Sequence, residues 1–443
     1  MERAKLIVKN FGPLKDIDIE VREMVAIIGA QASGKSTLAK LISIFEDESF
    51  RGDTNNISFQ NELEKYNILS FLKTDTYIEF KSVDVYKSIA HFKYSENKFT
   101  KTTIQNTLSA IKKIVENANS NKELIDVFKN LIADIIDFYK LVIKDEFYLI
   151  FDTEIQKVKF EVEFSNIRFK NLKIKNSDID ILLEILEKEK IIENYIYLYE
   201  KIMSVFPNIF LFDSIYISSE RNFLHIIAEN VLGLINNNVK IPKHLLNIGQ
   251  EYEKAIQTIK ELPLSIIDKK IKYKREGKSS YIYHNETDKV DLLESASGLQ
   301  SVVPILLLVE YSKTLKEEYN FNFVVEEPEL NLYPKAQHEL IKYLVKNCLF
   351  ERKNLILTTH SPFVLASINN LLLAYDKGQK YPKEVNKIIK KESWLNPKNF
   401  IAYELKNGKA KKIMNDKLGQ ISENMIDSVS DSFADEFNKL LDL

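Results

Sequence analysis

The feature that most constrains this chain is a glycine-containing segment near its start that fits the pattern G-x-x-x-x-G-K-[ST]. A short apolar run, residues 24–28, precedes it with the composition of a buried parallel strand. Apolar residues at helical spacing follow it, so we expect a helix to begin near Gly34. Such a strand–loop–helix unit binds a triphosphate, because free N–H groups at the helix start face the negative charge. The segment comprises Gly29, Ala30, Gln31, Ala32, Ser33, Gly34, Lys35, Ser36 and Thr37.

Two residues of this loop have specific expected roles. Lys35 would reach the β- and γ-phosphates, and the Ser36 hydroxyl would hold Mg²⁺. A chance match in a surface loop is the alternative, and the flanking strand and helix patterns argue against it. The sequence therefore predicts that the protein binds ATP or GTP together with Mg²⁺.

A second anion-binding helix start is predicted much later in the chain. The small residues from Ser295 to Gly298 form a turn that opens an apolar helix, and Ser297 supplies a hydroxyl donor there. The same pattern also fits an ordinary helix N-cap. This segment alone therefore does not define a site.

Two further apolar runs end in groups suited to phosphate chemistry. The run 323–325 leads into Glu326 and Glu327, and adjacent strand residues point to opposite faces. Glu326 can then assist the Mg²⁺ shell while Glu327 orients and deprotonates the attacking water. The run 355–357 leads to His360, which lies where a γ-phosphate contact is useful. A solvated strand end and a structural histidine are the alternatives.

Taken in chain order, these segments resemble the ATP-binding-cassette head of the SMC/Rad50/OLD group, and more closely the small prokaryotic ATPases called AAA15 or AAA21. Two positions depart from the usual transporter pattern: Leu299 replaces the second signature glycine and Glu326 replaces an aspartate. The segment 216–221, which ends in Glu220 and Arg221, resembles a strand-end Glu-Arg motif of the group. The matching motifs are residues 29–36, 297–300, 326–334 and 359–362.

The resemblance implies a fold, cofactors and a mechanism. The fold class would be α/β: an ABC-type head, with a mixed sheet flanked by helices, that uses ATP and Mg²⁺. ATP would lie between two heads, and Ser297, Gly298 and Gln300 of one would complete the site of the other. ATP would thus drive formation of a dimer or higher homo-oligomer. No clear Q-loop is present, and Gln60 is the candidate.

The pattern along the chain predicts a head split by an insertion. Residues 1–102 read as the N-terminal lobe, 103–205 as a mainly helical insertion with a strand pair near 158–164, and 206–443 as the C-terminal lobe. The insertion would contact a partner or act as a sensor, or it would be a structural addition to the head without a binding role. Apolar residues at four-residue intervals with an acidic opposite face predict a final amphipathic helix over 420–443. We expect this helix to pack on its own head; docking on a partner is the alternative.

Composition fits a large cytoplasmic protein. The single cysteine, Cys348, excludes a disulfide framework, and its place on an apolar helical stripe predicts a core position. There is no long uninterrupted apolar run and no signal-peptide pattern, so no membrane association is expected. The net charge of −2 does not indicate nucleic-acid binding, although it leaves it possible. The basic run 269–275 alternates and is predicted to be a solvated sheet face; a DNA-binding groove is the alternative.

The functional prediction is an ATPase that hydrolyses ATP, oligomerises around it and controls a separate effector. The residues after His360 are expected to be too few for a Toprim nuclease domain, so the effector would be another protein. The chain resembles ATPase subunits of bacterial antiphage modules of the PARIS and Septu types, in which a nuclease or Toprim protein is encoded alongside. The alternatives are a DNA-repair or chromosome-maintenance ATPase, and an ATP-gated scaffold with little turnover.

Overall fold

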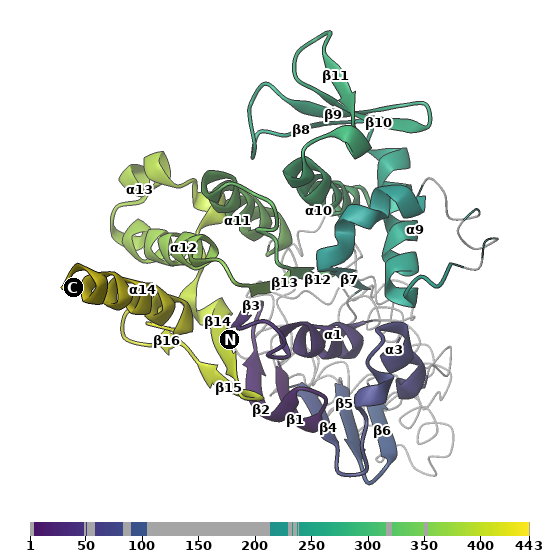
Figure 1. Cartoon of the computed structure of the whole chain (residues 1–443), viewed down its shortest axis with the longest axis vertical. Helices are drawn as coiled ribbons and strands as arrows, with labels where there is room; N and C mark the ends of the chain where they lie inside the picture. The colour runs from purple at the N-terminus through teal and green to yellow at the C-terminus, as the bar shows by residue number, and fades with distance from the viewer. Residues whose placement is uncertain are drawn as a thin grey trace, which may run out of the picture.

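The computed structural model describes residues 4–47, 50, 58–82, 90–103, 213–228, 233, 237, 239–315, 321–349 and 353–442. Within these ranges the central element is an eleven-stranded mixed sheet flanked by helices, which confirms the expected α/β fold class (Figure 1). The predicted helical insertion and its strand pair lie, from residue 104 onward, outside the described residues.

The large sheet has the order β6-β5-β4-β1-β2-β15-β14-β3-β13-β12-β7. Its strands are β1 (Ala4–Phe11), β2 (Leu14–Val21), β3 (Met24–Gly29), β4 (Tyr77–Ser82), β5 (Ala90–Ser95), β6 (Lys98–Thr103), β7 (Asp213–Ile217), β12 (Phe321–Glu326), β13 (Lys353–Thr359), β14 (Phe400–Lys406) and β15 (Lys409–Lys412). The helices are α1 (Lys35–Glu46), α3 (Phe59–Lys65), α9 (Lys243–Thr258), α10 (Ser297–Thr314), α11 (Pro334–Cys348), α12 (Pro362–Lys380), α13 (Pro382–Ile388) and α14 (Met425–Leu441).

The sheet has a parallel and an antiparallel half. Strands β14, β3, β13, β12 and β7 run parallel, whereas β2, β1, β4, β5 and β6 pair antiparallel. The register places Glu326 beside Thr358, and Thr359 beside Ile28. The carboxyl ends of β3, β12 and β13 therefore meet at one edge, where ligands bind in open α/β sheets.

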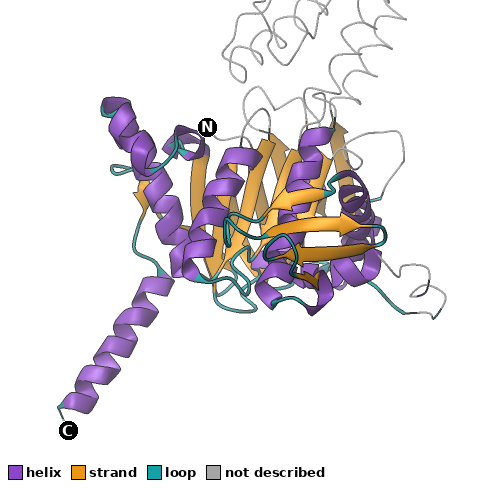
Figure 2. Ribbon diagram, turned by 90° about the horizontal axis from the view of Figure 1, so that it is seen from above, coloured by secondary structure: helices purple, strands orange, loops and turns teal. Residues whose placement is uncertain are grey.

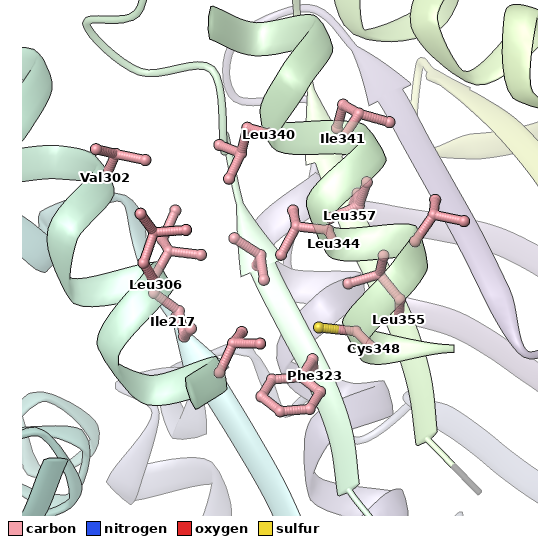
Figure 3. Packing of buried hydrophobic residues seen from close by; sticks show 14 of the residues in the cluster. Ile217, Val302, Leu306, Phe323, Leu340, Ile341, Leu344, Cys348, Leu355 and Leu357 are labelled. Carbon is pink, nitrogen blue, oxygen red and sulfur yellow. The ribbon is translucent and has the colours of Figure 1, made fainter. Parts of the chain in front are cut away.

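The core lies on both faces of the parallel half. Met24, Ala26 and Ile28 of β3 pack with the helices α9 to α12, whereas Val25 and Ile27 pack with α1. This alternation follows from the two-residue period of a strand. On the α10–α11 side, Cys348 is fully buried beside Phe323 and Leu355, so the predicted core position is confirmed (Figure 3).

The helix α10 crosses this core and begins at the expected second anion-binding position. Its residues from Leu299 to Val309 are mostly buried, while Ser297 at its start is exposed. Apolar residues all round its surface are typical of a helix enclosed by protein. Among the described helices, α10 included, none is long and apolar enough to cross a membrane.

A small antiparallel sheet stands apart from the large one. It contains β8 (Glu261–Pro263), β9 (Lys272–Glu276), β10 (Ser279–Tyr283) and β11 (Lys289–Asp291), and a two-stranded sheet of β16 (Met414–Asn415) and β17 (Gln420–Ile421) lies near the C-terminus. Lys272 and Lys274 both reach Glu261, at 2.9 and 3.4 Å. The predicted alternation of the basic run 269–275 is thus confirmed, and both lysines take part in a solvated ion-pair group.

Only the first turn of the C-terminal helix packs on the described part of its own head, through Met425 and Ile426. Beyond Ile426, α14 projects away from the rest of the described structure (Figure 2), and Val429, Phe433 and Phe437 are 47 to 65% exposed. The amphipathic helix was predicted, but it begins at Met425 and not at 420, because Gln420–Ile421 form the strand β17; its expected packing was wrong beyond the first turn. The physical reason lies at its start: the Met425 N–H donates to the buried Glu404 at 2.8 Å, which fixes the direction in which the helix leaves.

Candidate nucleotide-binding site

The phosphate-binding loop joins β3 to α1, as the sequence predicts. Ala32 and Gly34 both have left-handed backbones, with φ of 59° and 100°. A Cβ on Gly34 would lie 2.6 Å from Leu14 Cδ2, and one on Gly29 would lie 2.7 Å from the Leu405 carbonyl oxygen. A side chain at either glycine would therefore clash with these neighbours, and the positive φ of Gly34 also favours glycine. The loop leads directly into the N-terminus of α1, where an anion can bind.

Lys35 is the buried cation of this loop. Its Nζ donates to the carbonyl oxygens of Gly29 and Ala30 at 2.9 and 3.0 Å. Burial lowers the pKa of Lys35, and the carboxylates of Glu327, Glu326 and Glu329 partly offset this effect. The ammonium group thus faces a group of carboxylates from the end of β12.

Two serine hydroxyls of the loop fit a phosphate and its metal. Ser36 is exposed at the first turn of α1, while Ser33 Oγ is buried and has no hydrogen-bond partner within the described structure. A buried hydroxyl without a partner is costly, and a phosphate oxygen beside it would satisfy it. No three His, Cys, Asp or Glu side chains of the described ranges are grouped so as to hold a metal alone. A Mg²⁺ ion with phosphate oxygens and Ser36 as ligands needs no such group.

Glu326 lies at the end of β12 and is held by two donors. The Tyr216 hydroxyl donates to Oε1 at 2.6 Å, and the Ser219 N–H donates to Oε2 at 3.4 Å. Burial, followed by the neighbouring Glu326, raises the pKa of Tyr216 well above its usual range, so Tyr216 remains a donor. Sequence reasoning missed this role of Tyr216, because no local pattern pairs the ends of β7 and β12.

Glu327 lies just beyond β12 and faces a different environment. Its backbone has a φ of 42°, and its N–H donates to the Thr358 carbonyl oxygen at 2.9 Å. Its Oε1 is 3.1 Å from Nε2 of His360, and both side chains are about one third exposed. The two carboxylates are separated as expected, but the left-handed turn separates them and strand alternation does not, because β12 ends at Glu326.

The loop that carries His360 is fixed by a third carboxylate. Glu329 Oε1 accepts hydrogen bonds from the His360 N–H at 2.8 Å and from Thr359 Oγ1 at 2.7 Å. Glu329 belongs to the Glu-Glu-Pro-Glu run, but its spacing alone did not reveal this role. It positions the turn that places His360 beside Glu327.

Arg221 connects the β12 end to the helix α10. Its guanidinium is fully buried and donates to the carbonyl oxygens of Glu326 and Glu327, both at 2.7 Å, and of Ser301 at 3.0 Å. Burial lowers the pKa of Arg221 to about 10, so it stays charged at neutral pH. The sequence indicated Arg221 only as a possible site residue. In the structure its hydrogen bonds hold the backbone that carries the two carboxylates.

The predicted signature residues surround the start of α10. A Cβ on Gly298 would lie 2.7 Å from the Asn331 carbonyl oxygen, so glycine permits close approach of the loop that follows β12. The Gln300 side chain donates to the carbonyl oxygens of Leu293 and Ser295 and thereby braces its own turn. Ser297 is exposed and free to meet a ligand from outside the chain.

The last two possible site residues differ in how they relate to this group. Gln60 is exposed in α3, and no described contact joins it to the phosphate-binding loop. Glu220 is exposed, but its carboxylate is close enough to the Tyr216 hydroxyl and the Arg221 guanidinium to interact electrostatically with both.

A phosphate-binding loop, two carboxylates and a histidine at the parallel edge of a mixed sheet define a nucleotide-binding domain of the α/β class. The sequence profile of the AAA ATPase domain family, AAA15, matches residues 1–365. The chain belongs to this family, which confirms the resemblance found in its motifs.

Solved structures with a similar fold share little sequence with this chain. The SMC head domain from Thermotoga maritima is 11% identical, with 93% of this chain and 98% of that chain covered and a TM-score of 0.35. The Smc head domain with an extended coiled coil bound to the C-terminal domain of ScpA, from Pyrococcus furiosus, is 12% identical, with 93% and 96% covered and a TM-score of 0.33. The ADP conformation of MJ1267, an ATP-binding cassette of an ABC transporter, is 12% identical, with 95% and 93% covered and a TM-score of 0.32. No match was found among curated proteins.

Proposed function

We propose that this protein hydrolyses ATP in the presence of Mg²⁺ and that two copies close around the nucleotide. The observation that carries the proposal is the meeting of buried Lys35 with the Glu327–His360 pair at the carboxyl ends of β3, β12 and β13. A cation for phosphate and a carboxylate–histidine pair for water are the groups that phosphoryl transfer to water requires.

Each group has a distinct part in the reaction. Lys35 binds the β- and γ-phosphates, and Glu327 accepts the proton of the attacking water while His360 orients its carboxylate. Ser36 directly, and Glu326 through water, would hold Mg²⁺, which would supply positive charge beside the phosphates when bound. Tyr216 and Ser219 keep Glu326 oriented for this task.

The second copy supplies the start of α10. Ser297 is exposed, and the N–H groups of the first turn of α10 carry the positive end of a helix dipole. Facing a γ-phosphate held by another copy, they complete the stabilisation of the transition state. This arrangement is what the AAA15 resemblance implies, and it makes ATP the link between two heads.

The direct test is nucleotide binding and turnover by Lys35→Ala. Because Lys35 acts as a point charge on phosphate, this variant loses ATP binding and hydrolysis while its circular dichroism and unfolding midpoint stay near those of the wild type. Lys40→Ala, which changes a lysine one turn further along α1, is the matched control and retains both. Normal ATP affinity in Lys35→Ala contradicts the proposal.

We further propose that the ATP cycle controls a separate effector, a nuclease or Toprim protein of an antiphage module. The support is the resemblance of the motifs to the ATPase subunits of such modules. Co-expression with the product of the neighbouring gene gives a stable complex on this proposal, and Glu327→Gln changes release of the partner when ATP is added. Metal-dependent cleavage of DNA or RNA by the purified chain alone contradicts it.

A further inference from the structure

Gln337 in the first turn of α11 is a buried polar residue outside the groups assigned to the reaction. The residue is 8% exposed, and both ends of its amide have a partner. Nε2 donates to the Leu332 carbonyl oxygen at 2.8 Å, and Oε1 accepts from Ser361 Oγ at 2.6 Å. Leu332 belongs to the loop that follows β12, and Ser361 to the loop that follows β13. Gln337 therefore joins the two loops that carry Glu327 and His360.

The loop after β12 is a short run of tight turns. The Leu330 N–H donates to the Glu327 carbonyl oxygen at 3.0 Å, and the Leu332 N–H donates to the Glu329 carbonyl oxygen at 2.9 Å. Asn331 between them has a left-handed backbone, with φ of 60°. Consecutive hydrogen-bonded turns therefore leave this segment little freedom between Glu327 and Leu332.

The loop after β13 is held on both flanks of His360. Ahead of it, the Glu329 carboxylate accepts from the His360 N–H at 2.8 Å. Behind it, the Ser361 hydroxyl donates to Gln337 and accepts from the first N–H groups of α12 as the N-cap of that helix. The direction of the His360 side chain is thus set by Glu329 on one flank and by Gln337, through Ser361, on the other.

An amide suits both contacts of Gln337. The Leu332 carbonyl oxygen needs a donor, whereas the Ser361 hydroxyl donates and needs an acceptor. Glutamine presents both kinds of group at one end, a carboxylate presents acceptors only, and a methionine side chain has no donor and only a weak acceptor. Both partner residues are buried, so loss of the amide leaves them without these bonds in a place where that is costly.

We propose that Gln337 is a positioning residue for His360, which it keeps within reach of Glu327. This inference rests on the function proposed above, in which the Glu327–His360 pair prepares the attacking water. The two side chains are 3.1 Å apart, and a misplacement of about 1 Å in such a pair costs about 10²-fold in rate. Gln337 bonds to neither the phosphate-binding loop nor the start of α10 within the described structure, so its loss affects turnover and spares ATP binding.

Gln337→Met is the first test, because methionine has a similar length and forms neither strong hydrogen bond. We expect kcat for ATP to fall at least about tenfold, while the Kd for ATP stays within a few-fold of the wild type. Gln379→Met is the matched control: Gln379 is exposed on α12, its Nε2 also donates to a backbone carbonyl oxygen, and its loss leaves kcat unchanged. Gln337→Glu keeps the acceptor for Ser361 and gives a smaller fall, and it decides the test if Gln337→Met does not fold.

Combination with His360→Ala separates positioning from general damage. If Gln337 acts through His360, then Gln337→Met lowers turnover no further in a chain that lacks the His360 side chain. Unchanged kcat in Gln337→Met, or a further fall by the same factor in the double variant, overturns the positioning role alone. Wild-type turnover in His360→Ala contradicts the function proposed for the pair, and this inference with it.

The placement of His360 is also measurable without turnover. The chain has six histidines, so ¹³C labelling of histidine rings gives few NMR signals, and the signal lost in His360→Ala identifies His360. Gln337→Met shifts this signal, whereas Gln379→Met leaves it in place. An unmoved His360 signal in a folded Gln337→Met overturns the proposal, even for a preparation that does not hydrolyse ATP.

Discussion

At the scale of single residues, the account depends on how Glu327 is held. Its left-handed backbone is of the kind that costs on the order of 1–3 kcal/mol when it persists in a folded protein. Three contacts offset that cost: its N–H donates to the Thr358 carbonyl oxygen, its own carbonyl oxygen accepts from Arg221, and its side chain meets His360. Strain supported in this way fixes the carboxylate beside His360, where the proposed mechanism requires a base.

Removing the charge of Glu327 separates binding from hydrolysis. Glu327→Gln keeps the shape of the side chain and the phosphate contacts, so ATP affinity stays within a few-fold of the wild type. Turnover falls by at least about 10²-fold, the scale of general-base catalysis, and an ATP-bound dimer accumulates. Isothermal titration and phosphate release measure the two quantities. Hydrolysis at the wild-type rate shows that Glu327 is not the base.

Replacing Arg221 tests whether the buried brace is needed. Arg221→Met removes the Arg221 hydrogen bonds to the carbonyl oxygens of Ser301, Glu326 and Glu327. Leaving a buried acceptor without a donor costs about 1–3 kcal/mol, so we expect a loss of at least that size in unfolding free energy. Urea unfolding measures the loss, and Arg275→Met in the small sheet serves as the partly exposed control. A change below about 1 kcal/mol contradicts the structural role.

At the scale of elements, the helix α10 is anchored by a neutral histidine. His225 Nδ1 accepts from the Tyr252 hydroxyl at 2.6 Å, and Nε2–H donates to the Gln300 carbonyl oxygen at 3.2 Å. Burial lowers the pKa of His225 to about 4, whereas the unfolded chain protonates near the usual 6.5. The contribution to stability is therefore complete above pH 6.5 and decreases as pH falls toward 4.

The resulting pH dependence is measurable by chemical unfolding. Between pH 7 and pH 5 the His225 contribution falls by about 2 kcal/mol, because the unfolded state takes up the proton first. His225→Gln reduces the loss of stability over this range by that amount, because glutamine takes up no proton. The same pH slope in His225→Gln and wild type contradicts the neutral anchor.

The sequence predicted elements better than contacts between elements. The strand before the phosphate-binding loop, the helix after it, and the ends of β12 and β13 follow from local apolar runs and glycines. The Tyr216–Glu326 bond and the Arg221 brace join residues about one hundred positions apart, and no local pattern encodes such pairing. For α14 the apolar stripe predicted packing on its own head, which was wrong for the outer turns, because the hydrogen bonds at Asn424 and Met425 that orient the helix start are not encoded in the stripe.

At the scale of the whole molecule, the chain belongs to the AAA ATPase domain family, and its candidate site and the start of α10 lie on different elements. The phosphate-binding loop and the carboxylates share one sheet edge, whereas Ser297 opens a different helix and is exposed. Arg221 joins the two within one copy, because its guanidinium donates to the carbonyl oxygens of Ser301 in α10 and of Glu327. The proposed dimer makes this link run between two ATP sites.

The most direct test of the central claim mixes two inactive variants. Ser297→Arg blocks the start of α10 but leaves that copy's phosphate-binding loop intact, whereas Lys35→Ala has the opposite defect. Each variant alone has no composite site and is inactive. A mixed dimer contains one intact site, so we predict recovery of ATP hydrolysis on mixing, up to about half of the wild-type rate per mixed dimer if the sites act independently. Absence of recovered activity, with mixed dimers verified by native mass spectrometry, would show that each head works alone and would contradict the shared site.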